Sequence, residues 1–325
     1  MRVIARRLFF YLVTAVIAIS LDFLIPRLIP GNPVEAILAK MPGQVTPAVI
    51  HALDVQFGVN TSASLWTQYV HYWSNVVHGN LGVSVGNGFA PVSTVIRGAL
   101  PYTLGLIGVA TVISFVLGTA IGAIVAWKRG SRLDSLLPVV TFFQAAPYFF
   151  LAFLALALFA IKLGWFPSGR AAQIGDFPAF TCTYISDVLD HAVLPGLTIV
   201  LASAAGWIVG MRNVMLTTMD EDYVLIAAAK GLAKPRVIWY AARNAILPSV
   251  SGFALAIGFI VSGSLLTEIV FSYPGLGSLL VQAVSDDDYA LMQGLFLIIT
   301  FAVLAANLIA DFVYVFLDPR TRQEA

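Results

Sequence analysis

The sequence contains few charged residues. Only 11% of its 325 residues are Asp, Glu, Lys or Arg, less than half of the about 25% found in a typical soluble domain. Apolar side chains make up 59% of the chain, which is too much for a soluble core of this size. The composition therefore predicts a membrane protein that crosses the bilayer several times.

The sequence has one cysteine and lacks a nucleotide-binding motif. The single cysteine, Cys182, excludes a disulfide within the chain and any cysteine-based metal cluster. The sequence has no GxxxxGK[ST] loop, the motif whose backbone amides hold the phosphates of ATP. The chain is therefore not expected to hydrolyse ATP by itself. Its net charge of +1 gives no indication of nucleic-acid binding.

The apolar residues gather in six runs, each long enough to cross a bilayer core, which takes about 20 helical residues. The first run has the basic flank of a signal peptide but is too long for one, and no small-x-small cleavage site follows it. The expected fold class is an all-α polytopic membrane protein with six transmembrane helices. We expect these helices at Phe9–Ile29, Leu100–Trp127, Leu136–Leu163, Val193–Val214, Val250–Phe271 and Ala290–Leu317.

Basic residues predict the orientation, because cytoplasmic loops are enriched in Lys and Arg. With these six spans, thirteen of the 18 basic residues fall on one side of the membrane. The loop 216–248 and both termini, including the tail 318–325, are then cytoplasmic. Residues 1–29 contain the short cytoplasmic N-terminus and the first span. The five basic residues on the other side are Arg27, Lys40, Arg97, Lys162 and Arg170.

Residues 30–99 form the longest segment outside the spans, and we expect part of it to be helical. Thr46 followed by Pro47 is a favourable helix start, and Ser64–Val77 is an aromatic stretch that suits a helix at the lipid–water boundary. The second external loop, Gly164–His191, has no clear periodicity. The third, Ser272–Tyr289, contains the turn signal Tyr273-Pro274-Gly275.

A charged, alanine-rich segment, Asp220–Pro248, separates the fourth and fifth runs. Its acidic start favours a helix N-terminus, so Tyr223–Lys230 is expected to be a short helix that Gly231 ends. Pro235 suits the first turn of a second helix that runs to about Leu247. Three consecutive alanines give the first helix a low surface that another protein can approach closely. We interpret the segment as a docking element, with a solvated amphipathic connector as the equally weighted alternative.

Several motifs spread over nearly the whole chain point to one family. They are DYVLIAAAKGL and RNAILP in this segment, IPGNPVEAI, AAPYFFLAF, LGWFPSGR, HAVLPGLTI, LTEIVFSYPGLGSLL and NLIADFVYVFLDPRTR. Together they resemble the B-type permease subunit of bacterial peptide, opine and nickel ABC importers, and most closely the oligopeptide-import permeases. Three departures from the family pattern are visible. Leu225, Ile226 and Ala227 stand where the general coupling loop has Glu-Ala-Ala, and Asn32 replaces the usual aspartate of PGDP. The stretch from Gly231 to Pro248 is also about one helical turn longer than in the sugar importers.

The resemblance implies a type I ABC importer permease fold in the bacterial cytoplasmic membrane, with 100–317 as its transmembrane core. It implies a second homologous permease of the C type, two ATP-binding domains that carry ATP and Mg, and an extracytoplasmic peptide-binding protein, which we expect residues 30–99 to contact. This chain itself would hold no cofactor or metal and no catalytic residue. The residues expected to couple it to ATP hydrolysis are Asp222, Tyr223, Ile226, Ala227, Ala228, Ala229, Lys230, Gly231, Arg236 and Pro248.

Charged residues inside spans are costly and indicate function. Glu268 lies near the outer end of the fifth span, so we predict that it belongs to the translocation path or outer gate, with a hydrogen-bonded interfacial carboxylate as the alternative. The same region holds Phe271, Tyr273, Pro274 and Gly275. For Asp22 and Asp311, bonding between helices is the favoured interpretation.

Other patterns are weaker. His71 and His78 lack a third ligand for a metal, and Ser264 with His191 lacks the motif of a serine hydrolase. The pairs Gly118/Gly122 and Gly206/Gly210 allow helices to approach closely. The expected cargo is a short peptide, favouring oligopeptides over dipeptides, nickel or opines. An intramembrane hydrolase and a passive channel are the alternatives of another class, and neither would need ATP.

Overall fold

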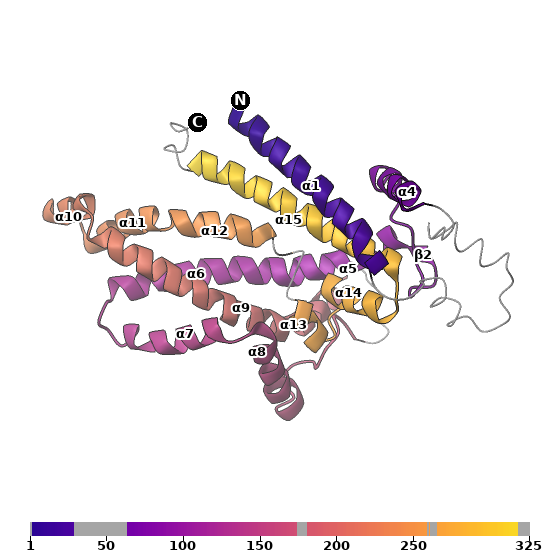
Figure 1. The fold of residues 1–325 in the computed structure, drawn as a ribbon. Helices are drawn as coiled ribbons and strands as arrows, with labels where there is room; N and C mark the ends of the chain where they lie inside the picture. The colour runs from indigo at the N-terminus through magenta and orange to yellow at the C-terminus, as the bar shows by residue number, and fades with distance from the viewer. Residues whose placement is uncertain (1, 29–63, 174–180, 259, 261–264, 318–325) are drawn as a thin grey trace. The chain divides into compact units, whose positions relative to one another are not determined.

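The computed structural model describes residues 2–28, 64–173, 181–258, 260 and 265–317, and Figure 1 shows their fold. The expected helix start at Thr46-Pro47 and the departure at Asn32 lie outside this range. The long helices are α1 (Arg2–Leu28), α6 (Val109–Trp127), α9 (Cys182–Met219) and α15 (Tyr289–Leu317). The shorter helices are α4 (Leu65–Val77), α5 (Val92–Thr103), α7 (Leu137–Ala145), α8 (Tyr148–Ala155), α10 (Asp222–Ala229), α11 (Lys234–Ala245), α12 (Leu247–Gly258), α13 (Leu265–Val270) and α14 (Leu276–Ser285).

Four stretches of continuous helix are long and apolar enough to cross a membrane. They are Arg6–Ile25, Val92–Trp127, Cys182–Met219 and Tyr289–Phe312. In the second of these, a π-helical turn at Leu104–Gly108 joins α5 to α6. These four correspond to the first, second, fourth and sixth expected spans. The stretches Val92–Trp127 and Cys182–Met219 begin well before the expected starts, because α5 starts inside the segment 30–99 and α9 starts inside the loop Gly164–His191. The loop expected over Cys182–His191 was therefore wrong.

The third expected span is not one straight helix. The helical pieces Asp134–Ala145 and Tyr148–Lys162 meet at an angle of 100°. Pro147 causes the break, since a residue before proline is pushed out of the helical region, and Ala146 has extended backbone angles of φ −71° and ψ 130°. A π-helical stretch, Leu156–Lys162, completes the second piece. In the fifth expected span, α12 and α13 flank residues beyond the described range, so the count of six spans stays a prediction.

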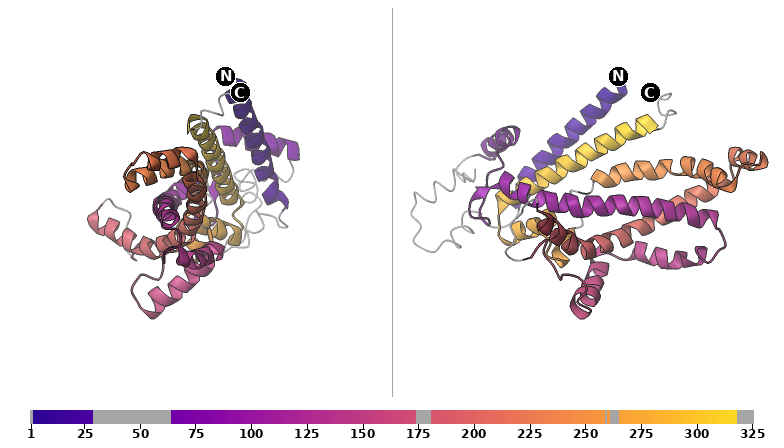
Figure 2. Two further views of the ribbon diagram at one scale, coloured as in Figure 1. Left: turned by 90° about the vertical axis from the view of Figure 1, so that its left-hand side faces the viewer. Right: turned by 180° about the vertical axis from the view of Figure 1, so that it is seen from behind.

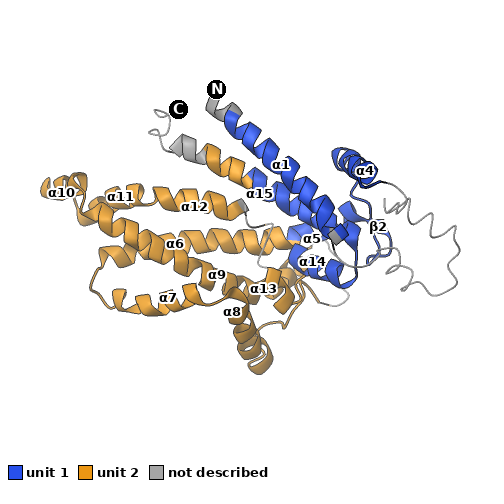
Figure 3. Ribbon diagram, in the orientation of Figure 1, with its two compact units in different colours: residues 1–101, 275–305 blue, residues 102–274, 306–325 orange. Residues whose placement is uncertain are grey.

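The chain divides into two compact units, which Figure 3 colours separately. Unit 1 contains residues 1–101 and 275–305, and unit 2 contains residues 102–274 and 306–325. In unit 1, β1 (Val83–Ser84) and β2 (Ala90–Pro91) pair antiparallel in a small hairpin. The buried carboxylate of Asp288 holds this hairpin, since it accepts hydrogen bonds from the Ser84 hydroxyl at 2.5 Å and the Gly86 amide at 3.0 Å.

The helix α4 lies against α1 in unit 1 and confirms the helix expected at Ser64–Val77. The Ser64 side chain caps it by accepting from the amide of Thr67 at 3.2 Å. Tyr69 and Tyr72 join it to α1 through hydrogen bonds of 2.7 Å to Ser20 and Asp22. The aromatic face of this helix is thus partly used within the chain.

Unit 2 is built around α6 and α9, which run side by side in Figures 1 and 2. Glycine permits this approach: a Cβ at Gly118 would lie 2.5 Å from the Cβ of Trp207, and one at Gly122 would lie 2.5 Å from the carbonyl oxygen of Ile208. The close packing expected for Gly118/Gly122 is confirmed. Gly206 and Gly210 behave differently, since an added Cβ at either would meet nothing within 4 Å in the described part of the chain.

Candidate functional site

The segment 220–248 folds into a helical hairpin, α10–α11, at one end of α9 (Figure 1). After α9 ends at Met219, the chain turns through Asp220, and Glu221 adopts an extended conformation that starts α10. The negative side chain of Asp222 lies in the first turn of α10, where the helix dipole favours it. Both short helices expected from the sequence are present, with bounds within two residues of those expected.

Gly231 ends α10 as expected. Its φ of +77° is a left-handed conformation that costs other residues about 1–2 kcal/mol. The amide of Gly231 bonds to the carbonyl of Ala228 at 3.0 Å, and that of Leu232 bonds to the carbonyl of Ala227 at 3.3 Å. This pair of bonds is the Schellman motif, which satisfies the last carbonyls of the helix. Pro235 then lies in the first turn of α11.

A buried apolar cluster holds the hairpin on α9. Val224 of α10 and Val237 of α11 are 4% and 5% exposed, and they pack with residues of α6 and α9. The other buried members are Ala126, Met211, Met215, Ala241 and Ala245. A hydrogen bond of 2.9 Å from the Asn244 amide to the Tyr223 hydroxyl links the two helices directly. The hairpin is therefore anchored to α9 and does not hang from it as a flexible loop.

The opposite face of α10 is open. Leu225 and Ile226 are 55% and 53% exposed, and Ala228 and Ala229 beside them are also exposed. Large exposed apolar side chains next to small ones form a surface suited to close contact with another protein. All the coupling residues expected from the sequence lie on the hairpin or at its exit, at Pro248 in the first turn of α12, and all are exposed except Ala227, which is half-buried.

Two features of this region were missed from the sequence. Trp239 and Tyr240 of α11 are 67% and 46% exposed, as expected for side chains at a membrane interface. In addition, Asp134 pairs with Arg212 of α9, with Oδ1 2.7 Å from Nη2 and 3.0 Å from Nε. Hydrogen bonds from the Gly130 amide and from Arg212 hold the pKa of Asp134 below its usual value. This ion pair ties the turn before α7 to α9.

Glu268, the candidate for the outer gate, is fully buried within unit 2. Its Oε1 accepts a hydrogen bond of 2.8 Å from the Thr103 hydroxyl, and its carbonyl accepts one of 2.7 Å from the amide of Tyr273. The Tyr273 side chain is also buried, and this burial raises its pKa. Phe271 is buried and Pro274 is exposed. Gly275 is buried and begins the part of unit 1 that contains α14.

The other candidate residues belong neither to the α10–α11 hairpin nor to the surroundings of Glu268. Asp22 is 4% exposed, with one carboxylate oxygen bonded to Tyr72 and the other without a partner among the described residues. Asp311 is half-buried in α15. His78 bonds to the carbonyl of Ser74, and His191 lies 3.3 Å from Asp187, while Ser264 is outside the described range. The described residues contain no group of three His, Cys, Asp or Glu side chains that could hold a metal.

Several long apolar helices, together with an anchored and exposed helical hairpin, define a multi-pass membrane protein. Residues 118–323 match the family described as the binding-protein-dependent transport system inner membrane component. The match covers more than half of the chain, and the chain belongs to this family. The resemblance to ABC importer permeases, and with it the type I permease fold, is confirmed.

Individual relatives cover almost the whole chain. It is 35% identical to a putative peptide permease protein of Brucella suis over 304 residues, 93% of each chain. It is 31% identical to the oligopeptide transport system permease protein AppB of Bacillus subtilis over 302 residues, 92% of each. It is 33% identical to the di/tripeptide transport system permease protein DppB of Pseudomonas aeruginosa over 341 aligned positions, 99% of this chain and 98% of DppB.

Proposed function

We propose that this chain is one permease half of an ABC importer that moves short peptides into the bacterial cytoplasm. The α10–α11 hairpin carries the proposal, because an apolar cluster anchors one face of it to α9 while Leu225 and Ile226 expose the other. The names of the relatives, all of them peptide permeases, support peptides as the cargo.

The hairpin is the docking site for an ATP-binding subunit, which lies on the cytoplasmic side together with both termini. ATP and Mg bind to two such subunits, and this chain has no ATPase activity. A second permease completes the pathway, and an external binding protein delivers the cargo. When the ATP-binding subunits close, they push on α10. Because α10 and α11 are short, stiff and packed on α9, the push reaches the spans as a shift between discrete packings.

Oligopeptides are the proposed cargo. The similarity to AppB supports this choice, while the similarity to DppB favours di- or tripeptides as the second candidate. Both relatives align over more than nine-tenths of the chain, so a test of function must include peptides of both lengths.

The test reconstitutes the full chain with its co-purifying subunits in lipid vesicles and measures ATP hydrolysis. Peptide-loaded binding protein is expected to stimulate hydrolysis and to drive peptide uptake. Ala228→Trp, on the exposed face of α10, is expected to abolish both effects because the bulk separates the docked surfaces. The matched control is Ser186→Trp, an exposed position near the other end of α9. An intact complex that no peptide stimulates, or equal loss in both variants, would contradict the proposal.

A further inference from the structure

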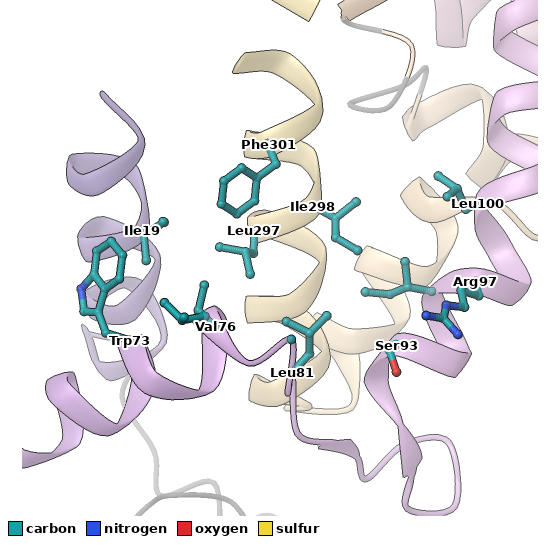
Figure 4. Close-up of a pocket in the computed structure, with 13 residues that line it drawn as sticks. Ile19, Trp73, Val76, Leu81, Ser93, Arg97, Leu100, Leu297, Ile298 and Phe301 are labelled. Atoms are coloured by element: carbon teal, nitrogen blue, oxygen red, sulfur yellow. The ribbon is translucent and has the colours of Figure 1, made fainter. Parts of the chain in front are cut away.

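Unit 1 contains an apolar groove that the docking function leaves unexplained. Side chains from α1, α4, α5 and α15 surround a pocket of about 560 Å³ (Figure 4), a volume within the range of small-molecule sites. The residues that line it are Ile19, Trp73, Val76, Val77, Gly79, Leu81, Ser93, Ile96, Arg97, Leu100, Leu297, Ile298 and Phe301.

Much of the groove's wall lies in membrane-spanning helix. Ile19 belongs to the apolar stretch Arg6–Ile25, and Leu297, Ile298 and Phe301 belong to Tyr289–Phe312. Phe301 is 44% exposed, so the apolar wall continues onto the outside of α15. A ligand in this groove therefore meets hydrocarbon surroundings over most of its length.

One cation stands at this otherwise apolar wall. Arg97 is the only ionisable residue among those that line the groove. Its side chain is exposed and pairs with no carboxylate of the described residues. Ser93 lies one turn before it on the same helix, and Trp73 of α4 lies on the other side of the groove (Figure 4). An arginine beside a hydroxyl is a suitable donor set for a phosphate group, and tryptophan favours the level of lipid headgroups.

The position of Arg97 along its helix places it at the level of the lipid headgroups. The helix Val92–Trp127 has 36 residues, so it is about 54 Å long and exceeds the bilayer core of about 30 Å. Arg97 is the sixth residue from its start, outside the apolar part that continues to Trp127. It is also one of the five basic residues on the predicted external side, where the positive-inside rule does not explain a cation.

We propose that this groove binds an anionic phospholipid from the leaflet on the external side. The phosphate accepts hydrogen bonds from Arg97 and Ser93, and one acyl chain lies along Leu297, Ile298 and Phe301 of α15. A lipid satisfies both the cation and the apolar wall. An apolar helix of another subunit would cover Arg97 without a counter-charge, which is costly in a membrane.

The experiment uses the full chain in membranes of the cells that make it. A phosphatidylglycerol with a photoreactive acyl chain is added, and labelled peptides are identified by mass spectrometry. Peptides from α5 and α15 are expected to carry the lipid. Arg97→Gln is expected to lower their labelling about tenfold, the loss expected for one charge-assisted hydrogen bond. Ile298→Trp, which fills the groove, is expected to lower it as well.

Lys162→Gln is the matched control, because Lys162 is another exposed cation on the predicted external side, at the end of a π-helical stretch of unit 2. It is expected to leave labelling unchanged. Photoreactive diacylglycerol, which lacks the phosphate, tests whether the headgroup matters. Equal labelling by both lipids, equal labelling of wild type and Arg97→Gln, or cross-links from this groove to another polypeptide would overturn the proposal. Only variants that reach the wild-type amount in the membrane and the wild-type melting temperature are compared, so that a misfolded chain does not count as loss of lipid binding.

Discussion

At the scale of the residue, Glu268 shows how a structure sharpens a choice between two roles. From the sequence, Glu268 near the outer end of a span is either part of the outer gate or a hydrogen-bonded structural residue. In unit 2 it is fully buried and bonded to Thr103. Burying an ionisable residue in a span is costly, which indicates that the residue has a role. Glu268 either fixes α13 or meets the cargo when the spans rearrange.

Glu268→Gln separates these two roles. Glutamine keeps the acceptor for Thr103, so folding is expected to stay near wild type, and peptide uptake is expected to fall because the carboxyl group is gone. Thr103→Val is the control: it keeps the carboxyl group of Glu268 but removes the hydroxyl that donates to it, which is expected to cost about 1–3 kcal/mol of stability. Uptake is measured in vesicles and the melting temperature on the purified complex. Unchanged uptake in folded Glu268→Gln would remove Glu268 from the translocation path.

Residues differ in how far the sequence reveals them. Gly231 and Asp222 were predictable because their roles are local, set by the turn of one helix. The pair Asp134–Arg212 was not, since the two residues are 78 positions apart and meet only because the turn before α7 packs against α9. The hydroxyl partner of Glu268 was missed for the same reason, as it is 165 positions away.

At the scale of the element, two glycine pairs with the same spacing have different roles. Gly118 and Gly122 let α6 and α9 touch, whereas Gly206 and Gly210 face nothing in the described chain. The spacing predicts close approach but does not say to what.

Alanine substitutions test this difference. Gly122→Ala is expected to destabilise the chain by about 1–3 kcal/mol, because its Cβ would overlap the backbone of α9. Gly210→Ala is expected to leave the isolated chain unchanged or more stable by up to about 1 kcal/mol, since alanine favours helix. Thermal unfolding of the purified chain in detergent measures both. Similar losses of stability in the two variants would contradict the packing inferred for α6 and α9.

The hairpin makes a second prediction at this scale. Gly231→Val is expected to uncouple ATP hydrolysis from peptide uptake more than it lowers membrane insertion. Valine is strained at a φ of +77°, yet a Cβ there would meet no described residue within 4 Å, so we expect the strain to stay in the hairpin. Gly164→Val is the matched control, because Gly164 has a φ of +64° and equally open space after the π-helical stretch Leu156–Lys162. Parallel loss of insertion and coupling in Gly231→Val would make Gly231 a folding residue only.

Helix existence was more predictable than helix shape. Apolar runs indicate where helices lie, so four spans and the hairpin were anticipated. The 100° bend at Pro147 was not, because the apolar run Leu136–Leu163 continues through the proline without a polar break. The early start of α9 at Cys182 was missed because Cys182–His191 contains several polar residues, so its hydrophobic signal is weak.

At the scale of the whole molecule, the sequence motifs identified the family correctly, since they are spread along the chain and the matching region, residues 118–323, includes most of them. They do not decide which way the protein lies in the membrane. That prediction depends on thirteen basic residues on one side, and charge bias is the physical signal that sets orientation during insertion.

The chain's only cysteine provides a direct test of orientation. Cys182 is exposed at the start of α9, whose 38 residues extend about 57 Å, so the helix ends reach water on both sides of a core about 30 Å thick. A membrane-impermeant maleimide is added to cells whose envelope outside the cytoplasmic membrane has been permeabilised, and it is expected to label Cys182. In a Cys182→Ser background, Ser135→Cys, exposed in the turn before α7, is expected to react only after the cytoplasmic membrane is opened. The reverse pattern would place the α10–α11 hairpin outside the cell, where no ATP-binding subunit could dock on it.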